Sequence, residues 1–472
     1  MVESGLFLDG CPLCSVSVGY PTVAAACPRS GCGLYREGNT SYGHRRSATP
    51  RRRLSRSAAA LAAGAFAVAT IVTGAGPASA DTVTDTITVG ASPLAVAITP
   101  NGDRAYVTNY GSNSVSVIDT AATPPVVVAT IGVGAAPARV AVDGNRAYVT
   151  DSESNTVSLI DTAATPPAAI GVGTLPFGVA VDGPRAYVAN YGSNSMSVID
   201  TATNTVVGTV PVGGNPAGVA VDGDRAYVTH LADGTVSVID TAASPPAVVG
   251  TIPVGTNPYG VAVDGNRAYV TNLTDDTVSV IDTAASPPAV VATIPVGTHP
   301  YGVAITPNGD RAYVTNRGDN SVSVIDTAAS PPAVVGTIPI GASPYGVAVD
   351  GNRVYVTNLN GTVSVIAIDQ PPTLAGTPVE GMVGQPYNHA FAVTGQPAPT
   401  VTATGTLPDG LTLSPGGVLS GTPTTAGTYT FTVTASNGIG DAAVLPVVLG
   451  ITDATPPPTG SLGGAGSVSW TS

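Results

Sequence analysis

Few side chains of this chain have types and spacings suited to catalysis. His230 and His299 fall within the repeated region described below, and as metal ligands they would need acids such as Asp151, Asp233 and Asp319 to converge on them. The chain has no GxxxxGK, no HExxH, no CxxCH and no nucleophile elbow. We therefore assign no catalytic residue, and we expect neither a metal ion nor a cofactor. We expect His230 and His299 to be solvent-exposed loop residues on the predicted binding face.

Aromatic and arginine side chains point to binding instead. Four rings follow a proline at equivalent positions of the repeats, namely Phe177, Tyr259, Tyr301 and Tyr345. A crescent of such rings could stack on sugars or cover an apolar patch of a partner, because aromatic residues are enriched in interfaces. The alternative is that each ring packs on its own neighbouring proline and glycine. Arg139 and Arg317 lie outside the regular arginine positions of the repeats, which makes them candidates for contacting an anionic group.

The charge distribution argues against nucleic acid as a partner. Residues 1–80 carry eight of the 17 basic residues and three of the 30 acids, whereas residues 81–472 carry a net charge of −18. Phosphate binding needs clustered Lys and Arg, and the chain contains no lysine. All four cysteines lie within residues 1–32, and their spacing lacks the two regular pairs typical of a zinc site.

A repeat of nearly constant length carries these candidate residues. One tyrosine recurs at intervals of 39 to 44 residues, at Tyr106, Tyr148, Tyr187, Tyr227, Tyr269, Tyr313 and Tyr355. Each unit holds four short β-rich runs separated by turn residues, such as 259–263, 267–271, 277–281 and 289–294. Four strands per unit and a period near 42 residues predict the blades of a β-propeller.

The two ends of the repeated region predict a closed ring. Residues 81–88 resemble an isolated fourth strand, while the seventh unit ends at Asp369 after only three strands. Pairing of the first strand with the last unit would complete one blade. We therefore predict an all-β chain with a seven-bladed β-propeller of four-stranded blades in residues 81–369, in which the N-terminal strand closes the last blade.

The repeated unit also resembles a known family. The repeat contains an AYVTN core, found at Ala105–Asn109, Ala268–Asn272 and Ala312–Asn316, together with PYGVAV and SVSVIDT segments. This combination is similar to the YVTN-family β-propeller repeat. This resemblance covers residues 81–369 and implies a bacterial or archaeal surface or secreted protein, of a family mostly without assigned activity. Asp151, Ala189 and His230 depart from the motif, but we expect them to leave the fold intact.

Pro371-Pro372 begins a second region. Residues 370–452 alternate β-rich runs such as TYTFTVTAS with Gly/Pro turns, which predicts a small β-sandwich. The segment LPDGLTLSPGGVLSGTPTTAGTYTFTVTASN is similar to the bacterial Ig-like (putative-Ig) modules of surface proteins, which implies a spacer or an adhesion unit. Residues 453–472 are rich in Pro, Gly and Ser, and we predict a disordered tail.

The N-terminal region predicts export. In residues 44–80 a basic segment precedes the apolar run AAALAAGAFAVATIVTGAG, and small residues up to Ala80 form a cleavage site, which is the pattern of a signal peptide. We expect residues 1–43 to be an unstructured extension that can precede the true translation start. The mature chain would begin near Asp81, contain no membrane span, and be secreted or held at the cell surface.

Comparison of the seven units with one another locates the predicted binding face. The loops that enter the first strand and those that join the second strand to the third vary between units, while the loops of the opposite face are monotonous. Binding sites concentrate on variable loops carried by a rigid scaffold. We expect a monomeric, non-enzymatic binding or adhesion scaffold for a protein or glycan of the cell envelope. The alternative is a propeller hydrolase or lyase, similar to lactonase-like proteins or streptogramin lyases, with its site on the same face.

Overall fold

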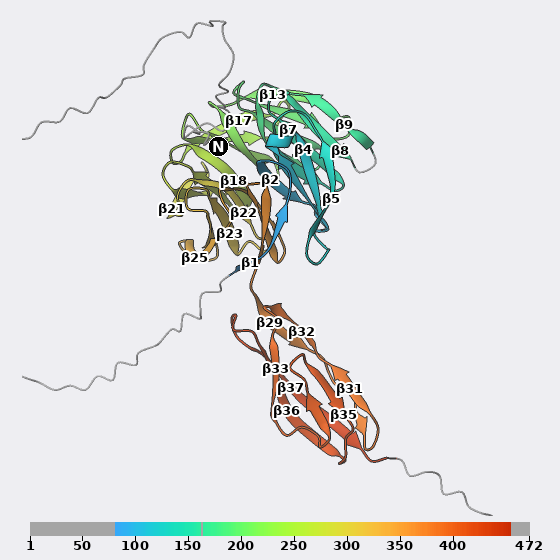
Figure 1. The fold of residues 1–472 in the computed structure, drawn as a ribbon. Helices are drawn as coiled ribbons and strands as arrows, with labels where there is room; N and C mark the ends of the chain where they lie inside the picture. The colour runs from blue at the N-terminus through green and yellow to red at the C-terminus, as the bar shows by residue number, and fades with distance from the viewer. Residues whose placement is uncertain (1–80, 162–163, 455–472) are drawn as a thin grey trace, which may run out of the picture. The chain divides into compact units, whose positions relative to one another are not determined.

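A computed structural model describes residues 81–161 and 164–454 (Figure 1). The predicted extension and signal peptide, the four cysteines, and residues 455–472 of the predicted tail lie outside the described residues. The described chain is built from β-strands with one short 3-10 turn, Tyr110–Ser112. None of its helices is long and apolar enough to cross a membrane.

Between Thr82 and Ala367 the described residues form seven four-stranded antiparallel sheets, called blades I to VII below. Blade I contains β2(Pro93–Ile98), β3(Arg104–Asn109), β4(Ser114–Asp119) and β5(Val126–Gly132); blade II contains β6(Pro137–Asp143), β7(Arg146–Asp151), β8(Thr156–Asp161) and β9(Ala164–Gly171). Blade III contains β10(Pro176–Asp182), β11(Arg185–Asn190), β12(Ser195–Asp200) and β13(Thr205–Pro211); blade IV contains β14(Pro216–Asp222), β15(Arg225–His230), β16(Thr235–Asp240) and β17(Ala247–Pro253). Blade V contains β18(Pro258–Asp264), β19(Arg267–Asn272), β20(Thr277–Asp282) and β21(Ala289–Pro295); blade VI contains β22(Pro300–Ile305), β23(Arg311–Asn316), β24(Ser321–Asp326) and β25(Ala333–Pro339). Blade VII contains β26(Pro344–Asp350), β27(Arg353–Asn358), β28(Thr362–Ala367) and β1(Thr82–Thr88).

Short turns fold each repeat into its own sheet. The first two strands of blade V, for example, end and begin at the paired residues Asp264 and Arg267, so only Gly265 and Asn266 form the loop. Gly265 has φ +52°, a conformation that glycine adopts without steric cost. At the same end of the blade, Asp282 pairs with Arg267, and Asp282 Oδ1 accepts hydrogen bonds from the backbone N–H groups of the two alanines that follow Thr283, as expected for a turn-capping aspartate.

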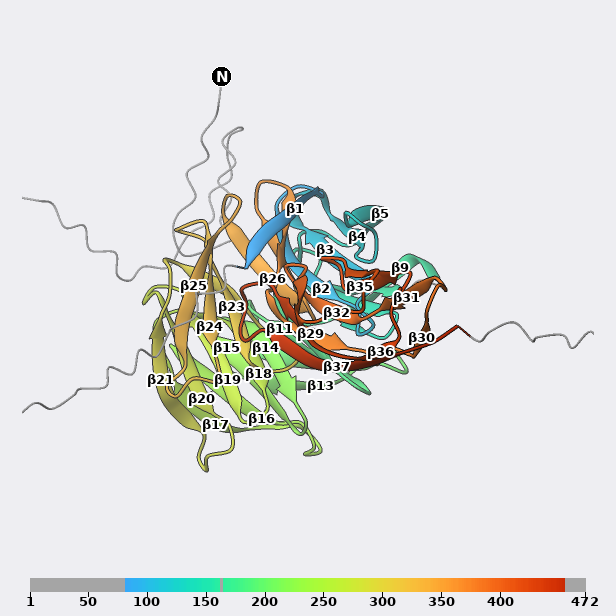
Figure 2. The same cartoon turned by 90° about the horizontal axis from the view of Figure 1, so that it is seen from below.

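The blades pack face to face around a centre (Figure 2). The first strand of each blade, called the inner strand, contacts the inner strand of the next, and β26 of the last blade contacts β2 of the first. Each interface encloses its own apolar core. Between blades V and VI, for instance, Tyr269 of the AYVTN motif is buried with Val278 and Ile294 against Val314 and Ile325. Because a single blade cannot bury both of its faces, these interface cores hold the ring together.

A threonine hydroxyl links the inner strands of neighbouring blades. Thr271 Oγ1 accepts a hydrogen bond from Gly260 N–H of its own blade at 2.8 Å and donates one to the Tyr301 carbonyl of the next blade at 2.9 Å. Six of the seven described blades share this relay, through Thr108, Thr150, Thr229, Thr271, Thr315 and Thr357. Blade III has Ala189 at the equivalent position and therefore lacks it.

The N-terminal strand completes blade VII, as the repeat pattern predicts. β1 pairs antiparallel with β28 over its whole length. Asp81, just before β1, is buried and accepts hydrogen bonds from Arg311 Nη1 at 3.0 Å, from the Tyr313 hydroxyl at 2.8 Å and from Asp369 N–H at 2.9 Å. In other blades the equivalent arginine donates instead to a threonine carbonyl of the next blade, as Arg267 does to Thr327. Asp81 thus takes the place of a carbonyl that blade VII does not provide.

Residues 370–452 form the predicted Ig-like sandwich. One sheet contains β30(Gly381–Met382), β37(Ala443–Thr452), β36(Gly427–Ser436) and β33(Thr400–Gly405); a second contains β31(Tyr387–Ala390), β35(Val418–Gly421) and β34(Leu411–Leu413); β29(Gln370–Ala375) pairs with β32(Ala392–Gln396). Alternate residues of the long strands β36 and β37 face a core that includes Phe391, Leu419, Phe431 and Leu449.

The missing relay in blade III predicts a stabilising substitution. Ala189→Thr should restore the hydroxyl that the other blades carry, and we expect it to raise the free energy of unfolding by about 0.5–1.5 kcal/mol. Urea unfolding followed by circular dichroism measures this. Ala189→Val, which adds similar volume without a hydroxyl, is the control, and equal stability of the two variants would argue against the relay.

Ring closure through Asp81 predicts a destabilising substitution. Asp81→Ala should lower the free energy of unfolding of the propeller by about 1.5–3 kcal/mol, because it leaves charged and phenolic donors of blade VI without their acceptor. The same urea titration tests it. Asp85→Ala, in the same strand, should have a much smaller effect because Asp85 is half-exposed. Equal losses in the two variants would contradict the closing role of Asp81.

Candidate functional site

A plug of seven side chains closes the centre of the ring at one end. Each inner strand contributes its second residue, and these residues form a single buried cluster: Leu94, Ala138, Phe177, Ala217, Tyr259, Tyr301 and Tyr345. The rings meet edge to face, with centroids 5.6 Å apart for Phe177 and Tyr259 and 4.9 Å apart for Tyr259 and Tyr301. The Tyr259 and Tyr345 hydroxyls are hydrogen-bonded to each other.

This burial corrects the expected role of the four rings. Phe177, Tyr259, Tyr301 and Tyr345 are at most 5% exposed, so they form no open crescent on which a sugar could stack. They also do not pack only on neighbouring proline and glycine, since they pack mainly on one another. The reason is geometric: equivalent positions of the inner strands converge at the centre of the ring, which brings residues from blades III, V, VI and VII into contact.

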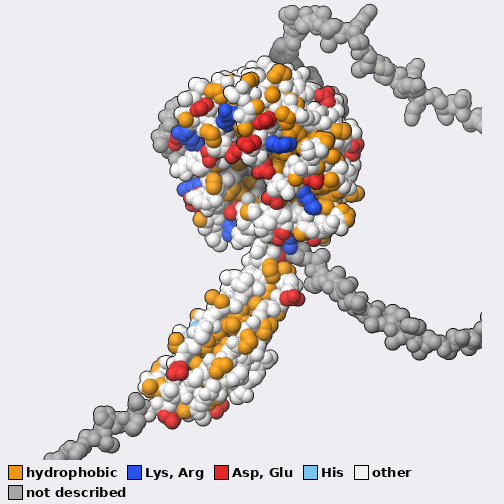
Figure 3. Space-filling view, turned by 180° about the vertical axis from the view of Figure 1, so that it is seen from behind, with side chains coloured by type: hydrophobic (Ala, Val, Ile, Leu, Met, Phe, Trp, Pro, Cys, Tyr) orange, Lys and Arg blue, Asp and Glu red, His pale blue; other side chains and the backbone are white. Residues whose placement is uncertain are grey.

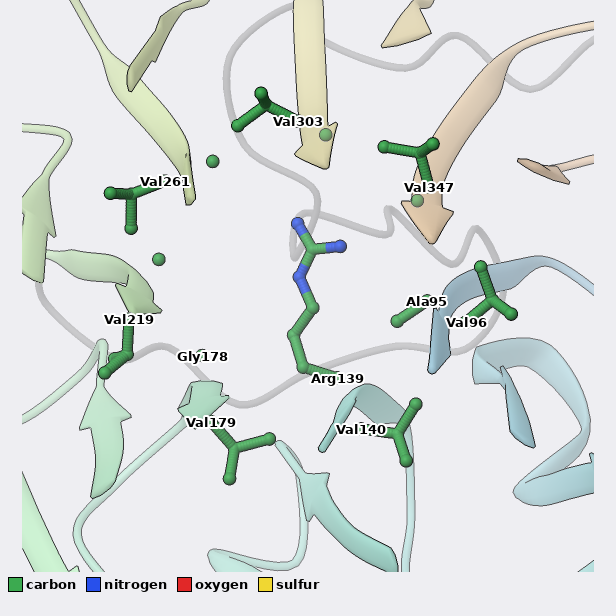
Figure 4. Close-up of a pocket in the computed structure, with 14 residues that line it drawn as sticks. Ala95, Val96, Arg139, Val140, Gly178, Val179, Val219, Val261, Val303 and Val347 are labelled. Atoms are coloured by element: carbon green, nitrogen blue, oxygen red, sulfur yellow. The ribbon is translucent and has the colours of Figure 1, made fainter. Parts of the chain in front are cut away.

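Arg139 projects into the axial channel beneath the plug. It occupies the third position of its inner strand, where five blades have glycine and blade I has Ala95. Its guanidinium carbon lies 5.3 Å from the ring centroids of Phe177, Tyr259 and Tyr345, within the range of cation–π attraction. Figure 4 shows this guanidinium in the middle of the inner strands, with Val261 and Val303 among the residues around it.

The channel around Arg139 is a cavity of about 190 Å³. The third and fourth residues of all seven inner strands line it, among them Gly218, Gly260, Val219 and Val261. Exposure rises along these strands: in β14 and β18 the first two residues are buried, the next four are half-exposed, and the last is exposed. The channel is therefore closed at the plug and opens toward the ends of the inner strands.

Two phenols of the plug, Tyr259 and Tyr345, stay neutral at ordinary pH. Burial raises the pKa of Tyr259 well above its usual value, and burial also raises the pKa of Tyr345, although the positive charge of Arg139 acts in the opposite direction. Neither ring is therefore a phenolate counter-ion for Arg139.

A second, partly exposed ring of side chains lies over the plug. Tyr110, Tyr191 and Leu359 are half-buried against the plug, and each comes from a loop between the second and third strands of its blade. Arg317 lies at the equivalent position of blade VI, where Nη1 donates a hydrogen bond to the Tyr301 hydroxyl at 3.1 Å. We did not single out Tyr110 and Tyr191 from the sequence, although they share one position in two NYGSN loops.

The loops of this face, called the plug face below, are tied together. An asparagine or aspartate near the end of one loop accepts a hydrogen bond from the backbone N–H that enters the next blade. Examples are Asn194 Oδ1 with Asn215 N–H at 2.9 Å and Asn320 Oδ1 with Ser343 N–H at 2.7 Å. Five of the seven described junctions between neighbouring blades have this hydrogen bond, whereas the loops of blades IV and VII have a glycine there, Gly234 or Gly361. The loops of the plug face are called the rim below.

The position of His230 contradicts the expectation of an exposed loop histidine. It is the last residue of β15 and is fully buried, with Nε2 2.8 Å from Ser237 Oγ. Burial lowers the pKa of His230 to about 4, so the imidazole is neutral at pH 7. Five other blades have asparagine here, and its amide likewise bonds to hydroxyls of the third strand, as Asn190 does to Ser197.

His299 is exposed on the plug face, in a turn at φ +52°. Two acids that could bind a metal together with the histidines form hydrogen bonds within their own blades instead. Asp233 accepts a hydrogen bond from Gly214 N–H at 2.6 Å, and Asp319 accepts one from Thr298 N–H at 2.6 Å. Within residues 81–161 and 164–454, no three His, Cys, Asp or Glu side chains are grouped so that they could hold a metal ion.

Comparisons with known proteins agree with the two kinds of β-domain. The family described as "Putative Ig domain" matches residues 362–452. A search of the curated proteins found no match.

Several solved structures resemble the chain at the level of fold. Hydrazine synthase of Kuenenia stuttgartiensis has 24% identity and a TM-score of 0.52, and the match covers 60% of this chain and 97% of that one. Virginiamycin B lyase of Staphylococcus aureus has 12% identity and a TM-score of 0.52, with coverages of 60% and 98%. The Cps50 (Swd1) β-propeller domain of Myceliophteria thermophila has 11% identity and a TM-score of 0.53, with coverages of 61% and 100%. At these identities the likeness shows the β-propeller fold alone.

Asp151 generates a prediction about pH. It replaces the asparagine of the other blades, it is fully buried, and its Oδ1 has no hydrogen-bond partner, while Oδ2 accepts from Ser158 Oγ at 2.7 Å. Burial raises the pKa of Asp151, so the folded state favours the protonated acid. Its contribution to stability is therefore greatest below the usual aspartate pKa and is lost as the pH rises through the raised pKa.

Asp151→Asn should therefore stabilise the protein at pH 7, and the gain should shrink as the pH falls toward 4. Urea unfolding at several pH values measures the difference. Asn190→Asp, the reverse change in blade III, should destabilise with the same pH dependence. A gain from Asp151→Asn that is constant between pH 4 and 7 would show that the buried charge is not its cause.

Proposed function

We propose that the protein is an exported, non-enzymatic binding scaffold whose plug face holds a protein or glycan ligand of the cell envelope. The observation that carries this proposal is the plug itself. Because buried side chains seal the channel on the variable-loop face, that face is a continuous surface of loops with no opening to an interior chamber. Such a surface suits recognition of a large ligand from outside.

The hydrogen bonds between loops support this proposal. Loops that are already held in place lose little conformational freedom when a ligand binds, so more of the contact energy contributes to affinity. In five blades the loop contacts the backbone of the next entry segment, so the side chains on the rim differ between blades while this backbone contact is repeated.

Candidate ligand contacts lie in the partly exposed ring over the plug. Tyr110 and Tyr191 are partly exposed and pack on the plug, and Arg317 adds a positive charge at the equivalent position of blade VI, over the ring of Tyr301. Tyrosine and arginine are the side chains that interfaces favour, because both combine apolar area with polar groups. His299 is also exposed on this face.

The remaining parts of the proposal rest on sequence. The signal-peptide pattern of residues 44–80 and the YVTN-like repeat favour a secreted or surface-associated protein, and the Ig-like domain suits a spacer or adhesion unit. We propose that the mature chain acts as a monomer.

A hydrolase or lyase on the same fold is the competing proposal. It is favoured by the presence of a lyase and a synthase among the structural neighbours, although their identity to this chain is too low to transfer an activity. Such an enzyme would require His230 to act as base or ligand, whereas its imidazole is buried and bonded to Ser237.

The plug face predicts a binding experiment. The purified protein should bind saturably to a fraction of the cell envelope, and the triple variant Tyr110→Ser, Tyr191→Ser, Arg317→Ser should lose at least tenfold in affinity. The pull-down is quantified over a range of protein concentrations, with fractions separated into protein and polysaccharide.

A matched control removes apolar side chains elsewhere. Val249→Ser with Val291→Ser changes two outer-strand residues that are 58% and 60% exposed, and it should bind like the unchanged protein. Loss of binding in this control but not in the triple variant would place the ligand on the outer strands. Absence of binding to every fraction would leave the scaffold proposal without support and favour the enzyme alternative.

A further inference from the structure

Arg139 has a charge without a counter-charge. The ion pairs of the described residues are Arg146 with Asp161 and Arg311 with Asp81, and Arg139 takes part in neither. Among the described residues, Arg139 forms hydrogen bonds only through its backbone N–H and C=O, both with Thr150 Oγ1. The guanidinium contacts three aromatic faces, and no hydrogen bond from any of its five N–H donors to the described residues is recorded.

Holding the Arg139 guanidinium in the channel costs free energy unless another group accepts hydrogen bonds from its N–H donors. A cation that is partly withdrawn from water loses hydration, and aromatic faces return only part of that energy and accept no conventional hydrogen bond. The phenols above it are neutral, as their raised pKa values indicate. The acceptors must therefore come from whatever fills the cavity of about 190 Å³ that Arg139 lines.

The position that Arg139 occupies has no large side chain in the other blades. At this position five blades have glycine, and a Cβ at Gly260 would come within 2.5 Å of the Tyr301 carbonyl oxygen, so the repeat normally excludes a side chain here. Arg139 is the one large, charged exception among the seven blades of the described chain. Filling space would require only an apolar side chain, whereas a guanidinium offers a planar fork of donors.

We propose that the axial channel is a binding site for a small, planar, monovalent oxyanion of the carboxylate class, held by the Arg139 guanidinium beneath the plug. Carboxylates match the donor fork of arginine through two parallel hydrogen bonds. The cavity has several times the volume of about 30 Å³ that one water molecule occupies in the liquid, so a ligand of a few non-hydrogen atoms fits beside the side chain.

The mouth of the channel restricts the charge of the ligand. The inner strands β6, β10, β14, β18 and β26 each end in an aspartate, and these residues are exposed or half-exposed. An arginine follows each of these aspartates after the hairpin turn, as Arg267 follows Asp264, so charges of both signs are interspersed there. Figure 3 shows the same mixture of charges on the propeller surface. Acidic side chains at the entrance disfavour polyanions such as phosphate esters more than a monovalent anion.

Acetate is the probe for this site, and acetamide is its neutral analogue of the same shape. Titration of acetate into the full protein, at constant ionic strength with chloride, is followed by saturation-transfer NMR of the acetate methyl group and by near-UV circular dichroism of the tyrosines. We expect saturable acetate binding and at least tenfold weaker binding of acetamide.

Three variants decide whether Arg139 is responsible. Arg139→Gly restores the residue of five other blades, and Arg139→Gln keeps most of the side-chain length without the charge; both should weaken acetate binding at least tenfold. Arg225→Ser removes an exposed arginine of the second strand of blade IV, which does not line the channel, and should leave acetate binding within twofold of the unchanged protein. Far-UV circular dichroism checks that each variant is folded.

The proposal would be overturned by equal binding of acetate and acetamide, by absence of saturable acetate binding, or by acetate binding that survives in a folded Arg139 variant. None of these results bears on the loops of the plug face, because acetate would enter from the opposite end. Failure of the channel site and failure of the proposed scaffold function are therefore distinguishable.

Discussion

The close approach of neighbouring inner strands is the constraint on which the rest of the propeller depends, and in six of the seven described blades a shared threonine hydroxyl bridges these strands. By accepting from one inner strand and donating to the next, each hydroxyl draws two strands together that have no backbone ladder between them. The strands approach so closely that a Cβ at Gly218 or Gly260 would meet the neighbouring carbonyl oxygen at 2.4 or 2.5 Å. Glycine at this position and threonine in the second strand occur together in blades IV to VII, whereas blade III keeps the glycine with Ala189 in place of the threonine.

The narrow centre that results explains both features of the site. The second residues of the inner strands have no space except over the axis, so the seven of them meet and form the plug. Small residues at Ala138 and Ala217 leave room for the larger rings of other blades, and the edge-to-face contacts use that room. Arg139 enters the space beneath the plug, where the aromatic faces compensate part of its desolvation.

The sequence predicted the architecture well because repetition records it directly: the four strands per unit, the closing pairing of β1 and the turn-capping aspartates all follow from the spacing of the copies. It did not predict that the four rings are buried, because periodicity says which residues are equivalent but not how near the axis brings them. The burial of His230 was not predicted for a related reason. Its equivalence to Asn109 and Asn190 was visible in the sequence, but the burial of that position arises only when neighbouring blades pack. Tyr110 and Tyr191 lie on the predicted face and lack a sequence signal stronger than their shared loop position.

The central claim is that the plug face, and not the outer strands, meets the ligand. Hydrogen–deuterium exchange of the purified protein, measured with and without the envelope fraction that it binds, tests this directly because it reports each loop without any substitution. The account predicts that protection on binding is concentrated in residues 110–113, 191–194 and 317–320. Protection confined to outer strands such as β17 and β21, or to the Ig-like domain, would contradict it.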